Sequence, residues 1–86
     1  MTDPAVESTL REFLLTEVFY DRELEDLGAE ESLIEGGLLD SLSILRIVTF
    51  CEERFGITIP DTEVLPDHFD SIQAIGKLVE RQRARR

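Results

Sequence analysis

The sequence predicts an all-α fold, a small antiparallel four-helix bundle with three main helices, one short third helix and a long first loop. Apolar residues recur at helical spacing in three stretches, and glycines and prolines separate those stretches. Residues 57–59 alternate as a strand would, yet no second strand is available to pair with them. A chain of 86 residues fits one domain, which we expect to span residues 1–86.

The first helix is expected to begin at Pro4, with Asp3 as its N-cap, because proline at the first helical position loses no hydrogen bond. We expect it to end at Phe19 or Tyr20. One apolar stripe follows from the spacing and consists of Val6, Leu10, Phe13, Leu14 and Val18.

Residues 21–40 form the long first loop, because Gly28, Gly36 and Gly37 interrupt any continuous helix. A connection of this length is uncommon in a compact domain and is usually functional. We expect it to cross the bundle and to pack its apolar residues underneath. These residues are Leu24, Leu27, Leu33 and Ile34.

A second helix is predicted over Ser41–Phe55, with Asp40 as N-cap and Gly56 as the left-handed residue that stops it. Its core stripe consists of Ile44, Ile47, Val48, Cys51 and Phe55. A neighbouring stripe, which the core need not cover, consists of Leu42, Leu45 and Thr49.

The short third helix is expected from Asp61, as its cap, to Val64, and Pro66 then restarts a turn that ends at Phe69.

Asp70 or Ser71 is expected to cap the last helix, and Gln73 lies where a capping box with Asp70 would place it. The apolar side of this helix consists of Ile72, Ile75, Leu78 and Val79. From about residue 80 to residue 86 the chain is basic, which complements the helix dipole, and we expect this tail to fray.

The net charge of −10 argues against nucleic acid or an anionic membrane as a partner. No apolar run approaches the roughly 20 residues that a membrane span needs, and the N-terminus lacks the pattern of a signal peptide. A single cysteine, Cys51, leaves no internal disulfide to form, so we expect a cytoplasmic protein.

Sites for catalysis or metal binding are not predicted. His68 is the only histidine and has no neighbouring ligands at zinc spacing, while Cys51 lies on a core stripe. No glycine-rich phosphate loop or calcium-binding loop occurs. We therefore expect that the chain is not an enzyme.

Ser41 is the candidate functional residue, because a serine at a helix start presents its hydroxyl outward, beside N–H groups that lack intrahelical partners. An anion attached there gains roughly 0.3–1 kcal/mol from the helix dipole. The Asp40-Ser41-Leu42 tripeptide alone is weak evidence for a functional serine, because such a serine is usually only a helix cap. The same pattern also recurs at Asp70-Ser71-Ile72.

The surrounding segments add specificity, and they begin with the run Gly37-Leu38-Leu39-Asp40-Ser41-Leu42. With residues 50–60 and 67–75, in this order, the chain resembles the acyl carrier protein family over nearly its whole length. The resemblance implies a four-helix fold and a 4′-phosphopantetheine arm joined to Ser41, with Asp40 and Leu42 beside it. The thiol of that arm would hold an acyl, aminoacyl or peptidyl group as a thioester.

The helix after the serine departs from fatty-acid-type carriers, in which it is densely acidic, because Ser43 and Arg46 stand where such carriers commonly have acids. We expect partners to dock mainly through apolar contact and shape. The predicted docking residues are Leu42, Leu45, Arg46 and Thr49. The alternative is that Leu42 and Leu45 simply pack under the long loop.

The resemblance also implies partners: a phosphopantetheinyl transferase, an adenylating acyl or aminoacyl ligase, and downstream condensing, modifying or transfer enzymes. The form Gly-Leu-Leu-Asp-Ser is similar to D-alanyl carriers and discrete peptidyl carriers. We therefore expect a monomeric, stand-alone carrier of specialised metabolism, of the nonribosomal peptide, polyketide or ligase-loaded type, rather than of bulk fatty-acid synthesis. The alternative function is an arm-less helical module for protein–protein interaction.

Overall fold

The computed structural model describes residues 4–19, 28–35, 37 and 39–84, and within these ranges it is all-helical, without a strand. The predicted all-α class is therefore confirmed. The elements are α1 (Pro4–Phe13), a π-helix η1 (Leu14–Val18), α2 (Ser41–Phe55), two 3₁₀ turns η2 (Asp61–Glu63) and η3 (Pro66–Phe69), and α3 (Ile72–Ala84). None of the described helices is both long and apolar enough to span a bilayer.

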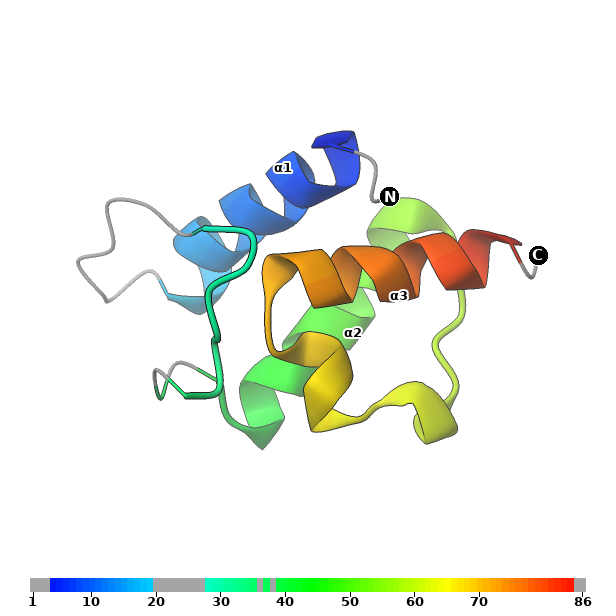
Figure 1. Cartoon of the computed structure of the whole chain (residues 1–86). Coiled ribbons are helices and arrows are strands. Elements are labelled where there is room, and N and C mark those ends of the chain that lie inside the picture. Colours follow the sequence, from blue (N-terminus) through cyan, green and yellow to red (C-terminus); the bar gives the residue numbers. More distant parts are fainter. Residues whose placement is uncertain (1–3, 20–27, 36, 38, 85–86) are drawn as a thin grey trace.

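Helices α1 and α3 lie side by side and run in opposite directions, and α2 crosses behind α3 from the lower left to the upper right (Figure 1). The core forms where the apolar sides of the three helices meet, closed by the segments on either side of η2 and η3. Its fully buried side chains are Val6, Leu10, Leu14, Leu33, Ile47, Cys51, Phe69, Ile72, Ile75, Leu78 and Val79.

The sequence predicted one continuous α-helix here. The structure differs, because a π-helical segment follows Phe13. The backbone N–H of Phe19 donates to the carbonyl of Leu14 at 2.7 Å, which is an i→i−5 bond. Apolar residues spaced four apart drift around an α-helix, because one turn holds 3.6 residues. The wider π turn offsets this drift and keeps Val18 and Phe19 facing the core. The proposed cap Asp3 and the possible end at Tyr20 lie outside the described residues.

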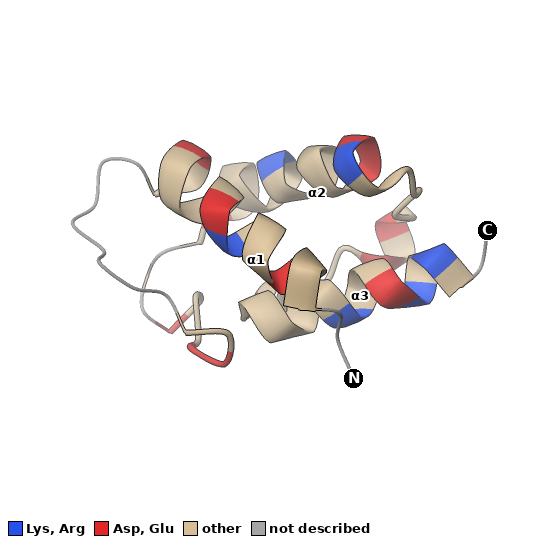
Figure 2. Ribbon diagram, turned by 90° about the horizontal axis from the view of Figure 1, so that it is seen from above, with Lys and Arg blue, Asp and Glu red and all other residues tan. Residues whose placement is uncertain are grey.

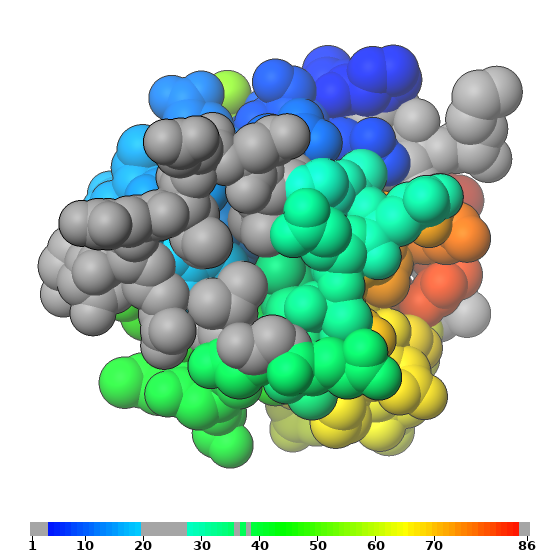
Figure 3. Space-filling view, turned by 60° about the vertical axis from the view of Figure 1, so that its left-hand side comes forward, coloured from blue at the N-terminus to red at the C-terminus, as the bar shows by residue number. Residues whose placement is uncertain are grey.

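Residues 28–35 of the long loop are bonded to the start of α3 and lie beside α1 (Figure 3). The N–H of Leu33 donates to the carbonyl of Asp70 at 2.6 Å, and the N–H of Gln73 donates to the carbonyl of Ala29 at 2.8 Å. Leu33 is fully buried, as predicted, whereas Ile34 remains 38% exposed. Leu24 and Leu27 lie outside the described residues.

The connection from α2 to η2 is held by two local features. Gly56 adopts a left-handed conformation (φ 64°) and ends α2, as predicted. A carboxylate oxygen of Glu52 then accepts the N–H of Ile59 at 2.9 Å. The expected short turn of helix forms as the 3₁₀ turn η2, which ends at Glu63, one residue before Val64. The expectation that Asp61 caps this turn is wrong, because Pro60 is at the N-cap position and no side chain caps η2.

The last helix is capped by Ser71, whose Oγ accepts the N–H of Ala74 at 3.0 Å. No capping box forms with Gln73, whose N–H is bound by the long loop instead. Helix α3 continues through the basic residues as far as Ala84, where it ends. Gln82 is buried, and the Arg83 guanidinium lies 5.1 Å from the ring centre of Phe55, so contacts with the bundle keep this segment helical.

Candidate functional site

Ser41 is the first residue of α2 and its side chain is exposed. Within the described ranges its hydroxyl has no hydrogen-bond partner, whereas the hydroxyls of Ser32, Thr16 and Thr49 all have one. An exposed hydroxyl at a helix start is accessible, and the helix N-terminus favours the negative charge of a phosphate group.

Asp40 fixes the start of α2 from an extended backbone conformation (φ −128°, ψ −178°). Its Oδ1 accepts the N–H of Ser43 at 2.8 Å and its carbonyl accepts the N–H of Ile44 at 3.0 Å, so the predicted N-cap is confirmed. The hydrogen bond from the backbone N–H of Ser43, and after it a hydrogen bond from the Ser43 side chain, lower the pKa of the Asp40 carboxyl. The carboxyl is therefore ionised at neutral pH and engaged with the backbone, not with the hydroxyl of Ser41.

The chain approaches Ser41 through a tight turn at Gly37. The N–H of Gly37 donates to the carbonyl of Ile34 at 3.0 Å, and the residue has φ +70°, a conformation that favours glycine. Leu39 then packs against the core and anchors the loop immediately before Asp40. The turn and this anchor together place the helix start at the surface.

The stripe beside the attachment residue is open. Leu42 is 67% exposed and Leu45 is 57% exposed, so the alternative in which both pack under the long loop is wrong. Arg46 and Thr49 are exposed as well. All four predicted docking residues therefore lie on one accessible face, and whether partners dock there remains a prediction.

The charge of this face differs from that of the whole chain (Figure 2). Glu52 is turned toward the N–H of Ile59, which leaves Glu53 as the outward acid of α2 against Arg46 and Arg54. No ion pair involves Arg46 in the described part of the chain. An acidic protein thus presents a helix surface that is apolar and nearly balanced in charge.

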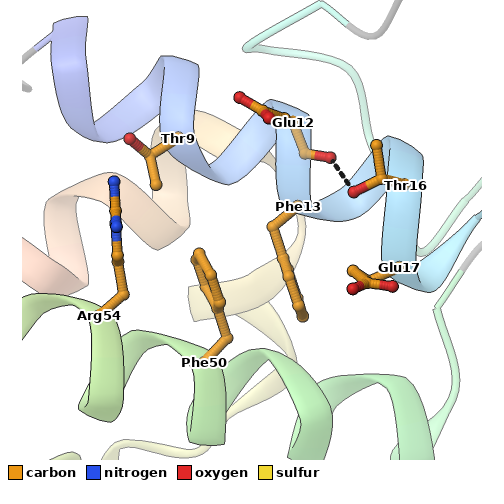
Figure 4. Close-up of a pocket in the computed structure, with 7 residues that line it drawn as sticks. All are labelled: Thr9, Glu12, Phe13, Thr16, Glu17, Phe50 and Arg54. Atoms are coloured by element: carbon orange, nitrogen blue, oxygen red, sulfur yellow. Dashed lines mark hydrogen bonds between the residues drawn. The ribbon is translucent and has the colours of Figure 1, made fainter.

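A groove between α1 and α2 was not predicted from the sequence. The rings of Phe13 and Phe50 stack in it with centroids 3.9 Å apart and an interplanar angle of 10°. One cavity of about 350 Å³ extends from this pair toward Thr9 and Arg54 (Figure 4). The sequence analysis placed Phe13 on the core stripe. Phe13 follows Leu10 by three residues rather than four, and this offset is the feature of the sequence that indicates a side chain directed toward α2.

The second Asp-Ser pair uses its polar groups internally. The Oδ1 of Asp70 accepts the hydroxyl of Ser32 at 2.6 Å and the N–H of Ile34 at 3.2 Å. Ser71 is half-buried and its Oγ is occupied as the cap of α3. The hydroxyl of Ser71 is therefore not available for attachment of a group in the way that the hydroxyl of Ser41 is.

The other two candidate side chains, His68 and Cys51, lie in surroundings that indicate structural roles. The Nδ1 of His68 lies 2.8 Å from the carbonyl oxygen of Glu63, and no cluster of metal-binding side chains occurs among the described residues. Cys51 is fully buried, and burial raises the pKa of its thiol to about 12, so it is not a nucleophile.

The residues at the start of α2 fit a phosphodiester-linked arm. The Ser41 oxygen is free to bond to phosphorus, and the helix start favours the negative charge that the phosphodiester brings. Among the described residues, no base lies within hydrogen-bond distance of this hydroxyl.

Comparisons with known proteins agree with this geometry. A family model described as "Phosphopantetheine attachment site" matches residues 14–79. The probable acyl carrier protein PigG of a Serratia species is 30% identical over 79 residues, which are 92% of this chain and 90% of that protein. The acyl carrier protein of Kocuria rhizophila is 45% identical over 42 residues, which are 49% of this chain and 52% of that protein.

Among solved structures, a chain from the crystal structure of an FAD-dependent dehydrogenase matches with a TM-score of 0.72 and 27% identity, over 81% of this chain and 97% of that chain. The matched family model and the nearly full-length match to a named carrier establish the assignment. The chain belongs to the acyl carrier protein family, whose members hold an acyl group on a covalently attached 4′-phosphopantetheine and are not themselves enzymes.

Proposed function

We propose that Ser41 is the residue to which the 4′-phosphopantetheine is attached. The carrying observation is its exposed hydroxyl, which has no hydrogen-bond partner in the described residues at the start of α2. Asp40 holds the first turn in place through the N–H of Ser43, and Leu42 provides an exposed apolar contact for the transferase. The arm supplies a thiol on which a carboxylic acid is held as a thioester.

The test is the intact mass of the protein after incubation with coenzyme A and a broad-range phosphopantetheinyl transferase. We expect a gain of one phosphopantetheine in the native sequence and in Ser71→Ala, and no gain in Ser41→Ala. A gain that persists in Ser41→Ala contradicts the proposal. An unmodified native protein supports the alternative, an arm-less interaction module of carrier-like fold.

We propose further that the cargo is an amino acid or another short carboxylic acid, loaded by an adenylating ligase in specialised metabolism. The support is the face that carries Leu42, Leu45, Arg46 and Thr49, which lacks the dense acids of fatty-acid-type carriers. Mass spectrometry of the protein from its native host, with the thioester intact, tests this. An aminoacyl or other short acyl mass supports it, and a series of long alkyl chains contradicts it.

An FAD-dependent dehydrogenase is our candidate for a downstream modifying partner, because this chain resembles a chain in the crystal structure of such an enzyme. The carried group would lose two hydrogens, one as a hydride to the flavin and one as a proton to a basic group of the dehydrogenase. Anaerobic mixing of the loaded carrier with that dehydrogenase should bleach the flavin and lower the cargo mass by two hydrogens. A flavin that stays oxidised with the loaded carrier contradicts this partner.

The proposed setting is a monomer in the cytoplasm. The supporting features are the single, buried Cys51 and the high net charge of −10, which disfavours self-association. Light scattering of the full chain and fractionation of the native host test these two points. A dimer mass, or recovery outside the cytoplasm, contradicts them.

A further inference from the structure

One carboxylate at the start of α3 binds the segment of the long loop that leads to α2. The Oδ1 of Asp70 accepts both the hydroxyl of Ser32 at 2.6 Å and the N–H of Ile34 at 3.2 Å. The hydroxyl oxygen of Ser32 in turn accepts the N–H of Glu35 at 3.1 Å. Directly or through Ser32, the Asp70 side chain therefore holds the loop at positions 32, 34 and 35.

Further bonds and contacts continue from this point toward the start of α2. The carbonyl of Ile34 accepts the N–H of Gly37 at 3.0 Å, which closes the turn with φ +70°. Leu39 then packs against the core, and Asp40 caps the helix. Figure 1 shows this part of the loop beside the start of α3 and leading down to the start of α2. The position of the helix start is thus linked to the Asp70 carboxylate through the loop.

The start of α2 has little else that fixes its position. The first buried residue of the helix is Ile47, six positions after Ser41. Within the described part of the chain, Asp40 bonds only to residues of its own helix. A helix end without buried side chains is among the parts of a fold that open most easily. The loop that precedes Ser41 therefore decides how steadily this helix start is presented.

Leu33 alone does not direct the loop as it leaves the core. Its side chain is fully buried, and its N–H donates to the backbone carbonyl of Asp70 at 2.6 Å. These contacts hold one residue, whereas the N–H of Ile34, the next residue, is held by the Asp70 carboxylate. Loss of the carboxylate leaves the Leu33 anchor in place and lets the chain between Leu33 and α2 take more conformations.

We propose that Asp70 is a positioning residue for the attachment of phosphopantetheine, because it holds the loop in the form in which a transferase binds the start of α2. This inference rests on the proposed attachment at Ser41. The apparent affinity of an enzyme that binds one form of the loop falls with the fraction of carrier in that form. Asp70 therefore acts on binding, and so on KM, while the cap made by Asp40 preserves the helix start on which kcat depends.

The experiment measures the initial rate of phosphopantetheine transfer from saturating coenzyme A to the full chain, over a range of carrier concentrations, by intact mass. The temperature is one at which circular dichroism shows every variant to be folded. Asp70→Ala should raise KM at least about five-fold and change kcat by less than about two-fold. Asp70→Asn should restore most of the native KM, because its amide oxygen can replace Oδ1, which accepts both bonds.

Two control variants separate positioning from stability. Ser71→Ala removes the neighbouring hydroxyl, whose bond to the N–H of Ala74 lies within α3. Val79→Ala shortens a fully buried side chain further along the same helix. Both should unfold more easily than the native chain and keep KM within about two-fold of the native value, because neither change removes a bond between Asp70 and the loop.

Ser32→Ala breaks the same link from the loop side and gives the same test should Asp70→Ala fail to fold. It should raise KM, and the double variant should raise KM less than the product of the two single effects. An unchanged KM in Asp70→Ala and Ser32→Ala, or an equal rise in the two controls, overturns this inference alone. A native chain that gains no mass overturns the proposed attachment and this inference together.

Discussion

The chain contains two helix starts with nearly the same three residues and opposite surroundings. At the start of α2, Asp40 and Ser41 are exposed and Leu42 is 67% exposed. At the start of α3, Asp70 and Ser71 are half-buried and Ile72 is fully buried. The same local pattern therefore gives an exposed helix start in α2 and a largely buried helix start in α3.

The difference teaches that the neighbours of a helix start decide its role. Asp70 binds Ser32 and Ile34 of the long loop, so the start of α3 is a junction that holds two parts of the fold together. Within the described part of the chain, Asp40 bonds only to the first turn of its own helix, through the N–H groups of Ser43 and Ile44. No group among the described residues bonds to the hydroxyl of Ser41, the proposed attachment residue.

The third residues of the two starts should differ most. Ile72→Ala should lower the free energy of unfolding by about 3 kcal/mol, because it leaves a cavity in the core. Leu42→Ala should change it by less than about 0.5 kcal/mol, because most of that side chain already contacts water. Urea unfolding followed by circular dichroism measures both, and similar losses in the two variants contradict the comparison.

The two aspartates should differ next. Asp70→Ala should cost about 2 kcal/mol, since it removes a charged acceptor from the Ser32 hydroxyl and the Ile34 N–H. It should also speed hydrogen exchange of the Ile34 amide. Asp70→Asn retains one acceptor and serves as the control, with a smaller loss. Unchanged exchange at Ile34 in Asp70→Ala means that the junction is not held by this side chain.

The two serines should differ by a smaller amount. Ser71→Ala should cost about 1 kcal/mol, the usual value for a lost N-cap, because the N–H of Ala74 loses its acceptor. Ser41→Ala should leave stability within a few tenths of a kcal/mol, since its hydroxyl bonds to nothing in the described residues. Thermal unfolding of both variants tests this difference. A larger loss of stability in Ser41→Ala would contradict it, because it would give the Ser41 hydroxyl a structural role.

The smallest effect concerns pH. The pKa of Asp40 is lowered in the folded chain from its ordinary value of 3.8, chiefly by the bond from Ser43. Its charge therefore stabilises the fold above pH 3.8, and this contribution is lost as pH falls through the lower, folded value. Unfolding of Asp40→Asn should be easier than that of the native chain at pH 7, with the gap closing in acid. A gap that stays constant down to acid pH contradicts the role given to the charge.

Local rules predicted the parts of the fold that depend on a few adjacent residues. Asp40 caps α2 and Gly56 ends it because each acts within one turn of itself. The link between Ser32 and Asp70 joins residues 38 positions apart, and no local spacing encodes such a contact. The stack of Phe13 on Phe50 depends in the same way on how two helices meet. The position of Ser41 was predictable, whereas the groove beside it required the packed structure.

Mapping the modified site in the native protein tests the central claim most directly. After loading from coenzyme A, trypsin should release Ser41 within residues 23–46 and Ser71 within residues 55–77. We predict that tandem mass spectrometry finds phosphopantetheine only on the first peptide, with fragment ions that assign it to Ser41. The modification on the second peptide, or on Ser32 or Ser43 of the first, would contradict the account.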